Sequence, residues 1–465
     1  MPTLPDVNID ILDGGLGLVS SSATGVHAKV GVCSAGTANQ IVGVSDPSKI
    51  KDLFGTGPLA NALGDSFQAG SSVMYAVRAA GDIAGVTGTV TFTKTGTGSM
   101  TVSGSPLDNY QVQVKIEDQG KINVASFRYS LDGGDNWSGK LTVQASYAIP
   151  DTGITLNFSE DAVTPENSFK TGDLYSFNTT APKASVSSIQ AAVQALLDSA
   201  YKFEFVHVVG EADAAVWTAL ASLATTAETK FRYIHFLAEA AGPGATDTVD
   251  DWVNARVTEA QSFASTRVSV CAARAEVIDL LTGRQVDRNL AGIYAGWVSA
   301  CKIQKSPGEV ALGAVPGIVR LLPAGLNDAH ILALDQARYV TFRQYIGEAG
   351  FYVTNGRMMA PETSDFRYVE LRRAMDKACG QVRTAALRRE HGEATEAGIE
   401  ALEGDLTAPL DIMIGAGEIT DGRVIIPKDQ DVIATSTLQI KVRIVPVPIM
   451  RWIEVEIGFE NPYQS

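Results

Sequence analysis

His207 and His235 are the residues most suggestive of metal chemistry among the five histidines of this 465-residue chain. Each lies inside an apolar run typical of a buried strand, so the two can occupy adjacent strands of one sheet. No cysteine or carboxylate stands near them at a spacing typical of zinc ligands. We therefore interpret them as core histidines, and a metal site is the less favoured alternative.

Two further stretches suggest ligand binding but favour a structural interpretation. Gly55-Thr-Gly57-Pro-Leu-Ala60 matches a dinucleotide-binding pattern, yet it follows a helix-like stretch, and Pro58 removes an amide that would hold a phosphate. Asp132, Asp135 and Asn136 suggest a calcium loop, but Asp-Gly is itself a hairpin signal. The sequence contains no nucleophile elbow, zinc-protease, phosphate-loop or EF-hand motif. We therefore predict a protein that is not an enzyme and that holds no cofactor or metal.

Composition and charge narrow the class further. The net charge of −15 argues against a general nucleic-acid binder, because phosphate contacts need Lys and Arg. No stretch reaches about 18 consecutive apolar residues, so no membrane span is expected. The N-terminal residues lack the pattern of a secretory signal, and we expect synthesis in a cytoplasm. No C-x-x-C pair occurs, so the four cysteines are interpreted as buried thiols; they are Cys33, Cys271, Cys301 and Cys379.

The pattern along the chain predicts several domains. Apolar runs alternate with amphipathic helices over 186–305, which indicates a mainly parallel sheet covered by helices on both faces. Residues 85–182 lose helical periodicity and show short alternating runs with turn signals between them, which indicates an inserted β-sandwich. A long helical region over 363–405 with a glycine interruption is followed by predicted strands over 409–449. The predicted fold class is thus α+β or α/β and multidomain, with an N-terminal arm (1–20), an α/β core (21–84 and 183–360), the inserted sandwich (85–182), a C-terminal α+β domain (361–450) and a C-terminal arm (451–465).

Both ends of the chain have the pattern of single β-strands without a partner nearby in sequence. Strict alternation of apolar and polar residues marks a half-buried strand. Such a strand must pair its backbone groups, either at the edge of its own domain or by addition to a sheet of a neighbouring chain. The apolar positions are Val7, Ile9 and Ile11 at the start, and Ile453, Val455, Ile457 and Phe459 at the end.

One predicted helix is locally basic in this acidic chain. Within 367–389, seven Lys and Arg residues stand against two carboxylates, Glu370 and Asp376. This helix is either a solvated face or a contact with an acidic protein surface. The candidates for that contact are Arg372, Arg373, Lys377 and Arg383.

The order of three stretches resembles the contractile tail sheath protein of tailed bacteriophages, which is related to the sheaths of R-type bacteriocins and type VI secretion systems. The first runs from Val30 through IVGVSDPSKIKDLFGTGPLANALGDSF to the strand ending at Arg78. The second contains NLAGIYAGWVSA, and it continues to the block in which the family's GaRT motif appears as Asn355-Gly356-Arg357-Met358. The third is the C-terminal segment LEGDLTAPLDIMIGAGEITDGRVIIPKDQD with its trailing strand.

The resemblance implies a structural protein of the phage tail, assembled in the bacterial cytoplasm. Sheath subunits stack as hexameric rings around an inner tube, exchange terminal strands and contract without a nucleotide. The implied partners are further copies of the chain, the inner tube, the baseplate and the tail terminator, with no nucleic acid and no membrane insertion. On this interpretation the basic helix faces the tube. Two rival functions remain: an adhesin or baseplate protein whose insert binds a receptor or glycan, and an α/β hydrolase.

Overall fold

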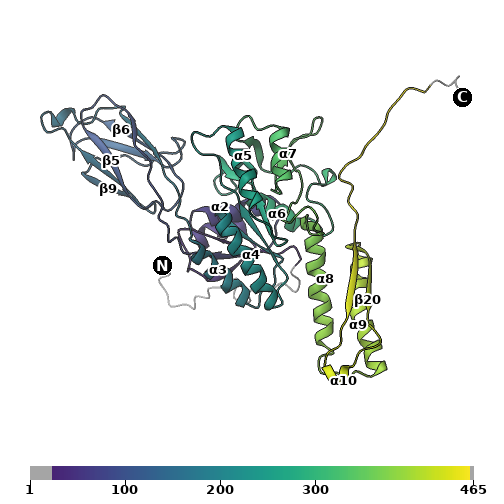
Figure 1. Ribbon diagram of the computed structural model, residues 1–465. Coiled ribbons are helices and arrows are strands. Elements are labelled where there is room, and N and C mark those ends of the chain that lie inside the picture. The colour runs from purple at the N-terminus through teal and green to yellow at the C-terminus, as the bar shows by residue number, and fades with distance from the viewer. Residues whose placement is uncertain (1–23, 461–465) are drawn as a thin grey trace, which may run out of the picture. The chain divides into compact units, whose positions relative to one another are not determined.

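The computed structural model describes residues 24–460 and divides the chain into two units (Figure 1). The first unit contains residues 24–301 and 307–369, and the second contains residues 302–306 and 370–460. Helices and strands occur together in both units. The mixed α+β class predicted from the sequence is confirmed.

A six-stranded sheet forms the centre of the first unit. Its order is β14-β13-β12-β1-β3-β2, and every neighbouring pair is parallel except β2 with β3. Strands β1, β13 and β14 are buried at every residue, which explains their largely apolar sequences. Their bounds are β1 (His27–Gly31), β2 (Ile41–Val44), β3 (Met74–Arg78), β12 (Phe205–Glu211), β13 (His235–Glu239) and β14 (Val268–Cys271).

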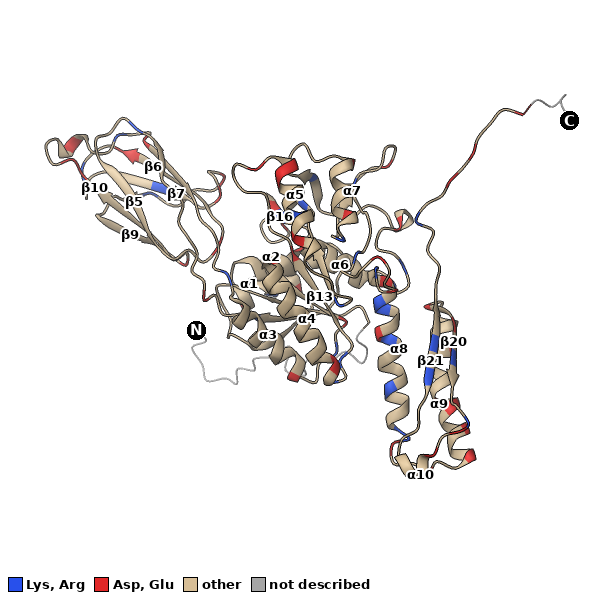
Figure 2. Ribbon diagram, viewed as in Figure 1, with Lys and Arg blue, Asp and Glu red and all other residues tan. Residues whose placement is uncertain are grey.

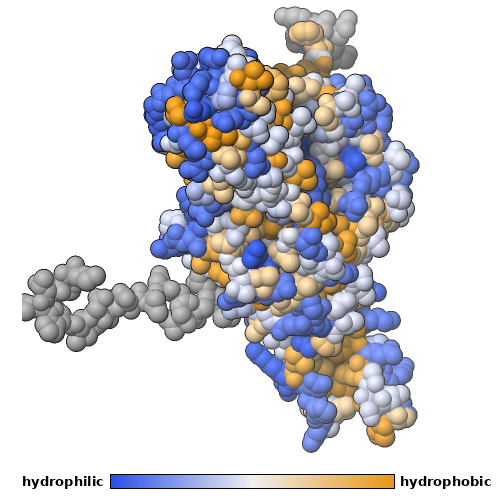
Figure 3. Space-filling view, turned by 90° about the vertical axis from the view of Figure 1, so that its left-hand side faces the viewer, coloured by the Kyte–Doolittle hydropathy of each residue, from blue (hydrophilic) through white to orange (hydrophobic). Residues whose placement is uncertain are grey.

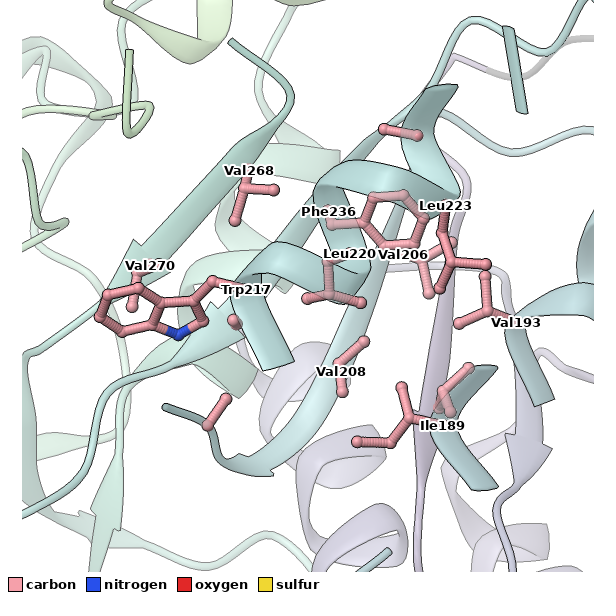
Figure 4. Close-up of a cluster of buried hydrophobic side chains, with 14 of the residues drawn as sticks. Ile189, Val193, Val206, Val208, Trp217, Leu220, Leu223, Phe236, Val268 and Val270 are labelled. Atoms are coloured by element: carbon pink, nitrogen blue, oxygen red, sulfur yellow. The ribbon is translucent and has the colours of Figure 1, made fainter. Parts of the chain in front are cut away.

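Helices α3 (Val186–Asp198) and α4 (Ala214–Thr229) cover one face of this sheet. Their apolar stripes point onto alternate strand residues (Figure 4). Each fully buried aliphatic or aromatic side chain contributes roughly 1.5–3 kcal/mol. The labelled cluster consists of Ile189, Val193, Trp217, Leu220 and Leu223 from the helices, and Val206, Val208, Phe236, Val268 and Val270 from the strands.

The opposite face carries α2 (Pro58–Gln68) and α6 (Ala291–Ala300), which pack closely on each other. Glycines allow this approach, because a Cβ at Gly296 would lie 2.4 Å from the backbone oxygen of Ser66. The small residues of the α6 sequence AGIYAGWVSA therefore have a packing role. The other helices of this unit are α1 (Ile50–Phe54), α5 (Val249–Gln261) and α7 (Asp328–Gln336).

Two sheets face each other in the segment between β3 and α3. One has the order β4-β11-β6-β7-β8 and the other β5-β10-β9. Their alternating inward residues form a separate apolar core that includes Phe127, Phe158, Phe169 and Tyr175. The strands are β4 (Thr91–Thr93), β5 (Ser99–Gly104), β6 (Gln111–Asp118), β7 (Ser126–Ser130), β8 (Leu141–Thr142), β9 (Ser146–Ile149), β10 (Ile154–Ser159) and β11 (Leu174–Asn178).

The two ends of this insert lie side by side. Ile83 and Lys183 exchange two backbone hydrogen bonds of 3.0 and 2.9 Å as an isolated antiparallel bridge. Figure 3 views the side on which the insert lies, and hydrophobic side chains there are interspersed with hydrophilic ones.

The first unit is completed by β15 (Arg274–Ile278), β16 (Gln285–Asn289), β17 (Ile318–Leu322), β18 (Phe342–Arg343) and β19 (Tyr352–Val353).

The second unit packs helices against a hairpin. Its elements are α8 (Val369–Leu387), α9 (Glu396–Gly415), β20 (Ile419–Ile425), α10 (Val432–Thr435) and β21 (Lys441–Pro446). The helical interruption falls between α8 and α9 and contains Gly392. The strands predicted to begin at residue 409 are wrong for 409–415, because α9 continues through Pro409. Leu406, Leu410 and Met413 recur at helical spacing and are buried, and this apolar face outweighs the backbone hydrogen bond that proline removes.

Candidate assembly surface

The hairpin of β20 and β21 has two open edges. The strands pair antiparallel, and within residues 24–460 neither has another strand beside it. An open edge presents a row of backbone N–H and C=O groups that can pair with a further strand. The hairpin can therefore accept one strand at each edge.

One face of the hairpin packs on the helices of its unit. Val424, Val442 and Ile444 contact an apolar cluster that includes Ala378 of α8 and Leu410 and Met413 of α9. An added strand with one apolar face would continue this packing, because alternate residues of neighbouring strands lie on the same face.

The other face of the hairpin carries exposed basic residues. Figure 2 shows blue segments on both of its strands, β20 and β21. Arg423 lies directly opposite Arg443, and Lys441 opposite Ile425. Like charges at directly opposite positions destabilise a strand pair. In the described part of the chain, Arg423, Lys441 and Arg443 have no ion-pair partner, so this face is positively charged and open to an acidic partner.

The chain beyond β21 is an exposed extended arm. Arg451 forms an ion pair with the buried Glu370 of α8 and fixes the root of the arm. Burial raises the pKa of Glu370, and the charge of Arg451 opposes that shift. No strand forms over the stretch from Ile453 to Phe459 in the single chain, although the sequence has a strand pattern. Ile457 and Phe459 are 93% and 110% exposed, so this apolar row is available to another surface.

The N-terminal candidates Val7, Ile9 and Ile11 lie outside the described residues. Their assignment as an exchanged strand stays a prediction.

The basic helix is α8, along which blue segments recur in Figure 2. Its cationic side chains differ in burial. Arg372 and Arg373 are buried, and Arg372 pairs with Asp376 at 2.5 Å within the helix. Lys377 pairs with Glu418 at 2.5 Å, and Arg383 is half-buried. Several of these cations thus have partners within their own unit, and contact with an inner tube stays a prediction.

His207 belongs to a buried polar chain in the central sheet. Lys29 Nζ lies 2.8 Å from His207 Nδ1, and His207 Nε2 lies 3.0 Å from Glu239 Oε1. These side chains come from the adjacent strands β1, β12 and β13. His235 lies on the strand next to His207, as expected, but its ring stacks on Phe205 instead of joining this chain. The interpretation as core histidines agrees with these contacts.

Burial controls the protonation of this polar chain. It lowers the pKa of Lys29 to about 7 and raises the pKa of Glu239 to about 7. It also lowers the pKa of His207 well below its usual value. Lys29 and Glu239 were not predicted from the sequence, although a lysine inside the apolar run HAKVG indicates a buried partner.

The block containing Asn355-Gly356-Arg357-Met358 is also structural. A Cβ at Gly356 would lie 2.6 Å from Val369 Cγ1, so only glycine fits there. Arg357 Nη2 lies 2.9 Å from Asp335 Oδ2, both side chains are buried, and the guanidinium also lies over the Tyr368 ring. Asp335, which the sequence analysis did not identify, neutralises a buried charge in the core.

The remaining ligand-like motifs are turns and helix ends. Gly57 precedes α2 and follows α1, so the Gly55–Ala60 stretch lacks the preceding strand of a dinucleotide site. The Asp132 carboxylate accepts hydrogen bonds from the backbone and side-chain amides of Asn136, which closes a local turn. Between residues 24 and 460 we find no group of three His, Cys, Asp or Glu that could hold a metal. Helices in that range are too short or too polar to cross a membrane.

Comparison with protein families gives two matches along one chain. The N-terminal domain of DUF2586 matches residues 4–357, and the C-terminal domain of DUF2586 matches residues 365–464. No curated protein matches the sequence.

Solved structures with a similar fold are sheath proteins. The contracted sheath of the extracellular contractile injection system PVC has a TM-score of 0.58 at 12% identity, with 99% of this chain and 98% of that chain covered. The contracted helical sheath of the anti-feeding prophage has a TM-score of 0.56 at 13% identity, with 99% and 100% covered. The sheath tail protein of Desulfitobacterium hafniense has a TM-score of 0.50 at 14% identity, with 95% and 100% covered. The chain therefore has the fold of sheath tail proteins, as the sequence resemblance suggested.

Proposed function

This chain belongs to the DUF2586 family, and on that premise we propose that it is the subunit of a contractile tail or injection-system sheath. The observation that carries the proposal is the combination of an exposed apolar arm and a hairpin with two open edges in the same chain. The sheath fold of the similar structures supports it. The subunit acts by assembly, as a structural component.

Strand addition explains how the subunits join. The arm supplies backbone groups and one apolar face, and the hairpin of a neighbour supplies an open edge beside the apolar cluster that it forms with its helices. Burial of one isoleucine, valine or phenylalanine side chain contributes roughly 1.5–3 kcal/mol, and ordering one residue of the arm costs about 1–2 kcal/mol. Because these terms nearly cancel, the contact depends on how well each apolar side chain is buried.

The larger assembly consists of hexameric rings stacked around an inner tube. Terminal arms keep neighbouring subunits linked while the rings rearrange, and the contraction drives the tube through the host envelope. The partners are further copies of the chain, the inner tube, the baseplate and the terminator, all within the tail particle. On this proposal the half-buried Arg383 and the exposed Arg388 of the α8 region are better placed to contact the tube than the buried Arg372 and Arg373.

Electron microscopy of the purified chain tests this function directly. Rods or stacked rings are expected for a sheath, whereas dispersed single particles at high concentration would count against it. Deletion of residues 453–465 is expected to abolish the rods and to leave a folded protein, because these residues lie outside the apolar core of the second unit. Full-length rods from the truncated chain would show that the C-terminal arm is not the link.

A further inference from the structure

The polar face of the C-terminal arm is acidic, and the exposed face of the hairpin is basic. Glu454 and Glu456 alternate with the apolar residues of the arm and are exposed. Lys441 and Arg443 are likewise separated by two positions on β21, and they lie on its exposed face. Neither these two glutamates nor these two cations have an ion-pair partner among the residues that the structure describes.

The apolar row of the arm fixes which way it must face. Ile453, Val455 and Ile457 can be buried only on the side of the hairpin that faces the helices, where Val442 and Ile444 already pack in a cluster with residues of α8 and α9. Side chains alternate between faces, so the two glutamates then lie on the exposed face. Residues opposite each other on adjacent strands have Cβ atoms about 4.5–5.5 Å apart, which brings each glutamate within reach of a cation.

The two edges of the hairpin are not equivalent for this arm. At the β21 edge, two cations stand at the spacing of the two glutamates. At the β20 edge, Arg423 is accompanied by Asp421, which would repel one glutamate. Charge complementarity therefore favours β21.

The arm of the same chain is poorly suited to reach this edge. Pro446 ends β21 and Pro448 follows two residues later. Proline has no N–H for a tight hairpin and favours extended backbone before it. To pair with its own β21, the arm would have to turn back on itself. The ion pair between Arg451 and Glu370 opposes that turn, because it holds the root of the arm in place. The arm of a second copy of the chain can pair with the β21 edge without a tight turn after β21 and without breaking this ion pair.

We infer that the β21 edge receives the arm of a second copy in a register that sets Glu454 and Glu456 beside Lys441 and Arg443. This inference rests on the proposed sheath function and adds to it a choice of edge and register. The ion pairs form only on association, since both partners are exposed in the single chain. They reject a register shifted by one residue, which would turn the glutamates toward the apolar face of the hairpin.

Charge exchange tests the pairing. In Glu454→Lys/Glu456→Lys, which changes only the exposed arm, we expect the concentration needed for assembly to rise roughly tenfold, because two attractive cross-strand pairs become repulsive. Lys441→Glu/Arg443→Glu is expected to cause a similar rise, and combining all four changes should restore assembly to within about threefold of the parent chain. The matched control is Lys428→Glu, an exposed charge of the second unit that lies outside both strands, and it should assemble normally.

Cysteine cross-linking determines which chain supplies the arm and whether the arm lies at the β21 edge. Glu454→Cys with Arg443→Cys reports an antiparallel arm, and Glu454→Cys with Lys441→Cys a parallel one. A ladder of covalently linked chains from either pair in assembled rods supports the inference. A link within one chain, no link in assembled rods, or charge-reversed variants that assemble like the parent chain would overturn it. A parent chain that forms no polymer would instead refute the proposed sheath function.

Discussion

Replacing Ile457 by alanine separates the stability of the folded chain from the stability of the assembly. Ile457 is 93% exposed, so its side chain has almost no contacts to lose in the single subunit. We expect the free energy of unfolding to change by less than about 0.5 kcal/mol, as for other exposed substitutions. In the proposed assembly the same side chain would be buried on the apolar face of a neighbour's hairpin.

The expected loss on assembly follows from that burial. Truncating a buried isoleucine to alanine costs about 2–5 kcal/mol in a packed core, and the lower part of that range applies to a surface that can relax. A loss of about 2–3 kcal/mol per contact weakens each association roughly 30- to 140-fold. On the proposed strand addition each subunit donates one C-terminal arm and receives one, so the concentration needed for assembly should rise by about the same factor.

Two measurements on the purified full-length chain check this expectation. Urea unfolding followed by circular dichroism gives the stability of the subunit, and the protein left in the supernatant after sedimentation gives the critical concentration. Ile346→Ala is the matched control, because Ile346 is 106% exposed and lies in a loop of the first unit. The reasoning fails if Ile457→Ala lowers the stability of the subunit by more than about 1 kcal/mol, or if its critical concentration matches that of the control.

Three other expectations concern the folded chain. Replacing residues 85–182 by a short Gly/Ser bridge should leave assembly intact, because the segments at the two ends of the insert already exchange hydrogen bonds. Loss of rods in electron microscopy would contradict this expectation. Arg357→Met should lower the free energy of unfolding by about 3–5 kcal/mol, because it leaves the buried Asp335 carboxylate uncompensated. The control Arg320→Met, at an exposed ion pair, should lower it by only about 0–1 kcal/mol. Similar losses for the two variants in urea unfolding would disprove a special role for Arg357. The folded pKa of Lys29, about 7, lies below the unfolded value of 10.5, so the unfolded chain binds more protons between these pH values and stability from Lys29 rises with pH there. Lys29→Met should remove roughly 1 kcal/mol per pH unit of that rise between pH 7.5 and 9.5, and an unchanged slope would refute the assignment.

Helices and strands could be predicted from the sequence where their residue pattern allows only one interpretation. Amphipathic helices alternating with apolar runs indicate strands covered by helices, and the six-stranded sheet has that arrangement. Alternating residues in the insert indicate half-buried strands, and they form its two facing sheets. Such patterns are local, because a period of two or of 3.6 residues follows from the geometry of one element.

One prediction was wrong because packing extends a helix. Strands were predicted from residue 409, but the apolar face of α9 keeps the helix intact through Pro409 to Gly415. The strand pattern of the C-terminal arm is real in the sequence, yet it forms no strand in the single chain, since a strand needs a partner for its backbone groups.

The amino-acid sequence by itself determined the class of the elements, the family resemblance and the presence of an arm with one apolar face. Only the tertiary structure decided which charges are buried and which are open. It joins Lys29, His207 and Glu239 across three strands that are far apart in the chain, and it leaves Lys441 and Arg443 exposed at a sheet edge. The physical reason is that charge pairing and edge exposure depend on distances between separate segments, and these distances exist only once the chain has folded.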